Sequence, residues 1–141
     1  AEVIALNSGM AAISNTLFSI AAAGKNIITS RHLFGNTYSF IAGTLSRFGV
    51  EPRLCDLTDI GAVEKVVDSN TCCIYVEIIT NPQMEVADLQ ALSRIVHERG
   101  IPLIVDTTLI PFTEFDSHSL GVDIEVVSST NLGAIMTHHE P

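Results

Sequence analysis

Residues 72–77 read CCIYVE, an apolar stretch of strand length that ends in a single carboxylate. A strand that is apolar at successive positions is typical of a sheet that is covered on both faces. Residues 102–106, PLIVD, repeat the pattern and also end in a carboxylate. Two such runs, separated by apolar residues at helical spacing, indicate parallel strands joined by a helix.

The same alternation of strand and helix extends over most of the chain. Strands are predicted at residues 3–6, 26–29, 52–55, 72–77, 103–106 and 124–127, and helices at residues 10–22, 37–48, 59–67 and 89–99. Asp59 and Asp88 stand at N-cap positions, and Gly49 and Gly100 follow helices. We predict a three-layer α/β fold with a mostly parallel sheet of about six strands and helices on both faces.

Size and composition narrow the class of protein. The chain has 141 residues, 47% of them hydrophobic, which suits one domain. A net charge of -9 from only 16% charged residues argues against a nucleic-acid partner. No segment is typical of a membrane span or a signal peptide, so we expect a cytoplasmic protein without a membrane partner. High apolarity with few charges favours a homo-oligomer, and the three cysteines are expected to be buried, reduced thiols.

Polar residues follow several of the predicted strands, where ligands bind in parallel sheets. Ser8-Gly9-Met10 opens a helix directly after a strand, so free amides and the helix dipole favour an anion such as phosphate. The motif is not GxGxxG, and a plain turn is the alternative. Ser128 and Thr130 present two hydroxyls that suit a phosphate, or else an ordinary N-cap.

Asp106 ends a buried strand, where a carboxylate is costly unless it has a partner. A cation, a metal or a protonated pyridine nitrogen would serve, and a capping aspartate is the alternative. Glu77 and Asp106 could also be read as a pair of catalytic carboxylates, one acid and one base. Nothing in the sequence places a reacting bond between them, so this function is not favoured. No metal site is predicted, because the adjacent His138 and His139 do not readily face one ion.

With these pieces in order, residues 2–130 resemble the Cys/Met-metabolism family of enzymes that depend on pyridoxal 5'-phosphate (PLP). The family includes cystathionine γ-synthase, cystathionine lyases, methionine γ-lyase and O-acetylhomoserine sulfhydrylase. The resemblance is carried by SGMAAI at 8–13, RHLFGNTY at 31–38, EIITNP at 77–82, VDTT at 105–108, and GVDI at 121–124 with SST at 128–130. It implies the large domain of a fold-type I PLP-dependent transferase, and a substrate of the homoserine or cystathionine type.

The resemblance also implies how the cofactor is held. The amides of Gly9 and Met10, with Ser128 and Thr130, would hold the phosphate. Asp106 would pair with the pyridine nitrogen.

Two further residues fall at family positions around the cofactor ring. Asn81 would lie near the phenolic oxygen. Phe34 stands where the family usually has a tyrosine stacked on the ring, so stacking can persist while the hydroxyl for proton transfer is lost. Ordinary core packing is the alternative for Phe34.

The largest departure from the family is Asn131, which stands where the lysine forms a Schiff base with the cofactor. An amide nitrogen cannot do this. The chain has two lysines, Lys25 and Lys65, and both are expected to lie away from the strand ends where the cofactor binds. The resemblance therefore implies an enzyme of sulfur amino-acid metabolism that is inactive in this form, and leaves open whether this chain binds PLP. The alternative is a non-catalytic module that binds phosphate or PLP, or that self-associates.

Compared with the family, residues 1–141 are expected to form a single, partial PLP-binding large domain. The family's N-terminal arm and C-terminal domain are expected to have no counterpart in these residues.

Overall fold

A computed structural model describes residues 2–110 and 115–129. Within them, five parallel strands form one sheet in the order β2-β1-β3-β4-β5. The strands are β1 (Asn26–Ser30), β2 (Glu51–Cys55), β3 (Thr71–Glu77), β4 (Leu103–Asp106) and β5 (Ile124–Val126). The predicted α/β class is therefore confirmed.

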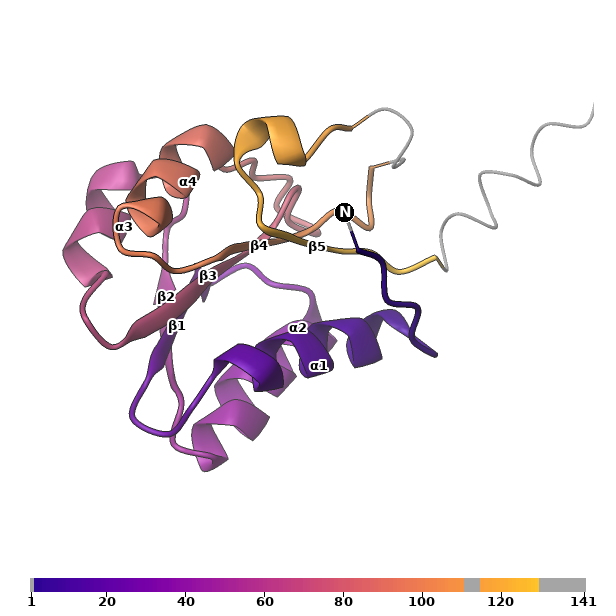
Figure 1. The fold of residues 1–141 in the computed structure, drawn as a ribbon, viewed down its shortest axis with the longest axis horizontal. Coiled ribbons are helices and arrows are strands. Elements are labelled where there is room, and N and C mark those ends of the chain that lie inside the picture. Colours follow the sequence, from indigo (N-terminus) through magenta and orange to yellow (C-terminus); the bar gives the residue numbers. More distant parts are fainter. Residues whose placement is uncertain (1, 111–114, 130–141) are drawn as a thin grey trace, which may run out of the picture.

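Helices cover both faces of the sheet, as Figure 1 shows. One face is covered by α1 (Gly9–Ile20), α2 (Gly35–Tyr38) and η1 (Ser39–Leu45), and the other by α3 (Ile60–Val66), α4 (Leu89–His97) and the short η2 (His118–Leu120). All seven residues of β3 are buried. Successive side chains of a strand point to opposite faces. Tyr75 accordingly packs with Leu17 of α1, whereas Ile74 packs in the cluster that includes Leu92 of α4.

The strand predicted at residues 3–6 is wrong. The segment forms no ladder with the described residues, and Val3 and Ile4 are 92% and 81% exposed. An apolar run becomes a strand only when a neighbouring backbone supplies hydrogen bonds. The sheet of the described residues thus has five strands, one fewer than predicted.

The four predicted helices are present, with one change of type. The helix predicted at 37–48 begins at Gly35 and widens into the π-helical η1, which buries Ile41 and Leu45. Asp59 and Asp88 cap their helices as predicted, by accepting hydrogen bonds from amides three residues later at 3.1 and 2.9 Å.

The fold brings the ends of two neighbouring, largely buried strands together. β3 ends at Glu77 and β4 at Asp106, and these two carboxylates are partners in the parallel register. The three cysteines are buried and free, as expected. Among the described helices, none is both long and apolar enough to cross a membrane.

Candidate functional site

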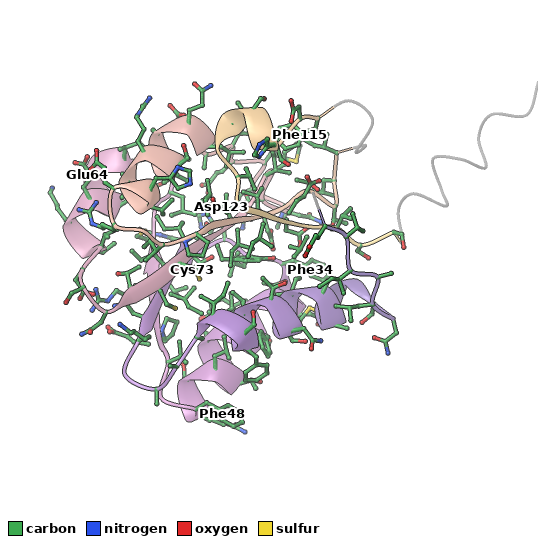
Figure 2. All side chains as sticks on the ribbon, in the orientation of Figure 1. Phe34, Phe48, Glu64, Cys73, Phe115 and Asp123 are labelled. Atoms are coloured by element: carbon green, nitrogen blue, oxygen red, sulfur yellow. The ribbon has the colours of Figure 1, made fainter. Side chains whose placement is uncertain are left out.

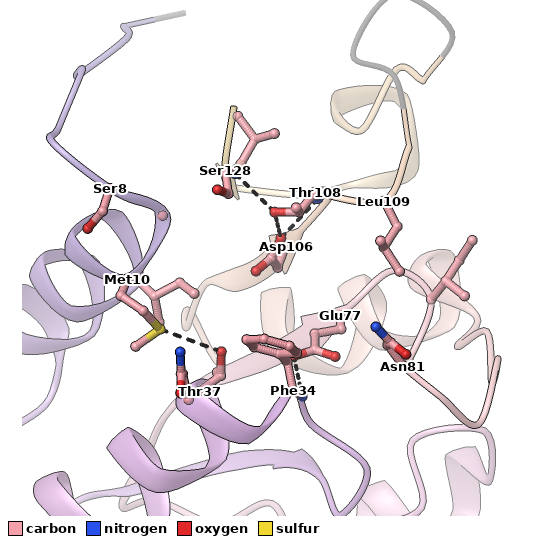
Figure 3. Close-up of a pocket in the computed structure, with 15 residues that line it drawn as sticks. Ser8, Met10, Phe34, Thr37, Glu77, Asn81, Asp106, Thr108, Leu109 and Ser128 are labelled. Atoms are coloured by element: carbon pink, nitrogen blue, oxygen red, sulfur yellow. Dashed lines mark hydrogen bonds between the residues drawn. The ribbon is translucent and has the colours of Figure 1, made fainter. Parts of the chain in front are cut away.

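A cavity of about 510 Å³ opens at the carboxyl ends of β3, β4 and β5, beside the start of α1 (Figure 3). This volume is in the range of sites for small ligands and cofactors. Its lining includes six residues that the sequence singled out: Gly9, Met10, Phe34, Asn81, Asp106 and Ser128. Thr130, Asn131, His138 and His139 lie outside the described residues.

One end of the cavity is built by backbone at the start of α1. Ser8 caps the helix, because its Oγ accepts a hydrogen bond from Ala11 N at 3.1 Å. Among the described residues, no acceptor meets the amides of Gly9 and Met10. Free amides at a helix start attract an anion.

Gly9 packs directly against Ser128, on the segment that follows β5. A Cβ atom added at Gly9 would lie 2.6 Å from Ser128 Cβ and 3.0 Å from Ser128 Oγ. Carbon atoms do not approach so closely, so this position requires glycine. The contact brings the start of α1 against the segment that carries the Ser128 hydroxyl.

The other end of the cavity is built around Asp106. Its Oδ1 accepts hydrogen bonds from Thr108 N at 2.9 Å and from Thr108 Oγ1 at 2.5 Å. Its Oδ2 accepts one from the hydroxyl of Tyr75 at 3.2 Å. The contact with Thr108 N is the local turn expected of a capping aspartate, yet the carboxylate also lines the cavity.

Thr108 joins the two ends. The same hydroxyl that donates to Asp106 accepts a hydrogen bond from Ser128 N at 2.9 Å. Figure 3 shows this chain of contacts along one side of the cavity. The position of Ser128 is therefore tied to that of Asp106.

Glu77 is a buried carboxylate in the cavity wall, with 7% of its surface exposed. Burial raises the pKa of Glu77 to about 7, and the nearby Asp106 carboxylate acts in the same direction. The amide of Phe34 donates to Glu77 Oε1 at 2.8 Å and opposes the rise. Glu77 therefore changes protonation near neutral pH while holding the Phe34 backbone.

Phe34 is a wall of the cavity and not part of the core, because 51% of its surface is exposed. Its loop and the loop that carries Asn81 are joined by His32 Nδ1 and Glu85 Oε2 at 2.9 Å. The two loops thus form one side of the cavity together.

The sequence profile described as "Cys/Met metabolism PLP-dependent enzyme" matches residues 1–133. The chain belongs to this family. It is 37% identical over 129 residues to an L-methionine gamma-lyase of Fusobacterium nucleatum, covering 90% of this chain and 32% of the relative. It is 33% identical over 130 residues to an O-acetyl-L-homoserine sulfhydrylase of Corynebacterium glutamicum, covering 92% of this chain and 30% of the relative.

The fold of this chain matches that of solved structures from the Cys/Met-metabolism family. The O-acetylhomoserine sulfhydrylase of Wolinella succinogenes superposes with a TM-score of 0.85 at 49% identity, over 88% of this chain and 36% of the other. A Campylobacter jejuni structure with N'-pyridoxyl-lysine-5'-monophosphate superposes with a TM-score of 0.82 at 36% identity. The match covers 86% of this chain and 29% of the other. The fold-type I architecture is thereby confirmed. The chain spans about a third of the length of these relatives.

The sequence did not indicate Tyr75, whose hydroxyl contacts Asp106 in the cavity. Tyr75 lies inside the apolar run of β3, where a tyrosine is simply a good strand former. Nothing in the sequence pairs it with Asp106, which is 31 positions away. The bridging role of Thr108 also needed the structure, although its place at a strand end was visible.

Proposed function

We propose that this chain binds PLP in the cavity and forms part of the large, PLP-binding domain of an enzyme of sulfur amino-acid metabolism. The observation that carries the proposal is the pairing of Gly9 with Ser128 at one end of a cavity that has Asp106 at the other. Free amides and a hydroxyl suit a phosphate, and a buried carboxylate suits a protonated ring nitrogen. The residues therefore fit the family's cofactor.

Each side chain has a proposed task. The Gly9 and Met10 amides, with Ser128 and the sequence neighbour Thr130, hold the phosphate. Asp106 keeps a proton on the ring nitrogen, and Asn81 lies near the phenolic oxygen. When bound, PLP supplies an electron sink for the α-carbon of an amino acid.

The Phe34 ring, which lines the cavity, would cover the cofactor ring without contributing a hydroxyl. It offers a flat apolar surface for stacking, while proton transfer from this position is absent. Glu77 holds the Phe34 amide and so sets where the ring lies.

The relatives' names, together with the family resemblance, suggest the substrate class. An O-acylhomoserine, cystathionine or methionine would undergo elimination or replacement in an active enzyme of this kind. We propose that this chain is inactive in its present form, because Asn131 occupies the lysine position. An amide can neither bond covalently to the cofactor nor move the substrate's proton.

The test is a titration of the chain with PLP, read by absorbance before and after borohydride. We expect the wild type to bind PLP without a reducible adduct and Asn131→Lys to gain one. Asn70→Lys, on an exposed turn before β3, is the matched control and should gain none. A reducible adduct in the wild type, with turnover of O-acetylhomoserine, would show that the proposed inactivity is wrong. Failure of both chains to bind PLP would overturn the cofactor proposal.

A self-associating module is the second candidate, favoured by exposed apolar side chains. Phe18 of α1 and Phe48 pack edge to face with ring centroids 5.7 Å apart, and their side chains are 47% and 62% exposed. Val3 and Ile4 are almost fully exposed. Such surface is typically hidden in an oligomer. Light scattering should give a homo-oligomer, and a well-folded monomer would contradict this candidate.

A further inference from the structure

Tyr75 is the largest of the fully buried side chains among the described residues. It sits on β3 beneath the cavity, on the face of the sheet covered by α1. Its hydroxyl reaches Asp106 Oδ2 at 3.2 Å, so a residue that lies outside the cavity lining contacts one that lies within it.

The hydroxyl of Tyr75 acts as a donor in this contact. Burial, followed by the nearby carboxylates of Asp106 and Glu77, raises the pKa of Tyr75 well above its usual value, while a hydrogen bond with the Thr37 side chain opposes the rise. A phenol that keeps its proton can donate to a carboxylate, which accepts only.

Within residues 2–110 and 115–129, two segments donate hydrogen bonds to Asp106. Thr108, on the segment after β4, supplies two donors to Oδ1, and Tyr75 of β3 supplies one to Oδ2. An ionised carboxylate has about four acceptor positions. Donors from the described residues fill three of these positions, and the carboxylate faces a cavity from which one further donor can arrive.

We propose that Tyr75 is a positioning residue for the cofactor's ring nitrogen, because its hydroxyl holds Asp106 in the orientation that meets that nitrogen. With Thr108 alone, only Oδ1 would be held, and the carboxylate as a whole could still turn about its Cβ–Cγ bond. Tyr75 fixes the second oxygen from a different strand, so the carboxylate is oriented before any ligand arrives. This inference rests on the proposed binding of PLP.

The test compares two ligands, PLP and the analogue in which carbon replaces the ring nitrogen, in titrations of the full chain. We expect the wild type to bind PLP about tenfold more tightly than the analogue, since a hydrogen bond to a charged group contributes about this much. Tyr75→Phe should lose most of that preference, through weaker binding of PLP and unchanged binding of the analogue. A merely structural role would weaken both ligands equally.

Two variants complete the experiment. Tyr38→Phe removes the chain's other tyrosine hydroxyl, which lies on an exposed part of α2, and should keep the full preference. In an Asp106→Asn background, Tyr75→Phe should change the ligand ratio no further, because both act through the same carboxylate.

The outcomes separate the two proposals. A wild type that binds neither ligand overturns the proposed function and this inference with it. If the wild type prefers PLP over the analogue and Tyr75→Phe prefers it to the same extent, the role of Tyr75 is overturned. The proposed function is left intact.

A second measurement covers the case in which Tyr75→Phe does not fold. In the Tyr38→Phe chain, 3-fluorotyrosine labels position 75 alone, and the fluorine resonance reports on the phenol. We expect the resonance to move more on addition of PLP than on addition of the analogue. Equal shifts with both ligands count against the proposal.

Discussion

The two ends of the cavity are built from different materials. The end at Gly9 and Ser128 consists mainly of backbone, with two amides that meet no acceptor in the described part of the chain and a position where an added Cβ would clash. The end at Asp106 consists mainly of side chains, with donors from Tyr75 and Thr108 converging on one carboxylate. At the first end, close packing excludes any larger side chain. At the second end, hydrogen bonds orient the carboxylate that a ligand would meet.

The difference predicts how each end responds to substitution. Where shape decides, one extra carbon should disturb both packing and binding. Where hydrogen bonds decide, an isosteric change should alter ligand preference while the fold persists.

Gly9→Ala should have the largest effect. The new Cβ would lie 2.6 Å from Ser128 Cβ, so the end of β5 must shift. We expect a loss of about 2 kcal/mol in the free energy of unfolding and a loss of PLP affinity of at least about 30-fold. Chemical denaturation and titration measure the two.

Gly43→Ala is the matched control, because nothing lies within 4 Å of a Cβ added there, on the η1 helix. It should leave PLP affinity unchanged. Equal losses from the two variants would show that the close contact at Gly9 does not matter.

Asp106→Asn should have the next largest effect, confined to the ring end. The amide keeps an oxygen for the Thr108 donors but loses its charge, so PLP affinity should fall about tenfold. Affinity for inorganic phosphate, which would use the other end, should stay the same. A parallel loss of phosphate affinity would contradict the division into two ends.

Glu77→Gln should change how stability depends on pH. Because the folded chain holds a proton on Glu77 up to about pH 7, and the unfolded chain only up to its ordinary value of 4.5, wild-type stability falls as pH rises between these values. The variant removes this contribution, which we expect to be about 2 kcal/mol once screening at the cavity is considered.

The measurement is chemical denaturation of wild type and variant at pH 4.5 and pH 8. Glu64→Gln, on the exposed face of α3, is the control and should leave the dependence unchanged (Figure 2). Identical pH profiles for wild type and Glu77→Gln would refute the raised pKa.

Phe34→Leu should have the smallest effect, because the ring is half exposed. Loss of stacking should weaken PLP binding about fivefold. Phe48→Leu is the control, since Figure 2 shows Phe48 at the lower end of the molecule, away from Phe34. Titration that finds no difference between the variants would remove the stacking role.

Much of the fold could be predicted because apolar periodicity reports burial. The runs that became β3 and β4 are apolar at nearly every position, and both strands lie between two layers of helices. The run at residues 3–6 is equally apolar and is not a strand. Strand pairing depends on a neighbouring backbone, which the apolar pattern of a single segment does not reveal.

The candidate site divides in the same way. Gly9, Asp106 and Ser128 were visible because polar residues and glycine interrupt the pattern at strand ends, and the structure brings them to one cavity. Their roles toward PLP stay predictions. The hydrogen bond between Phe34 N and Glu77 could not be predicted, because it joins backbone and side chain 43 positions apart.

The sequence alone determined the α/β class, the edge of the sheet where ligands can bind, and the residue types available there. These follow from local periodicity and from the rule that parallel strands end at a common edge. Only the tertiary structure decided that Gly9 must be a glycine, that Thr108 links the two cavity ends, and that Tyr75 contacts Asp106. Such contacts depend on distances of a few ångströms between segments remote in the chain, and these distances are set by packing.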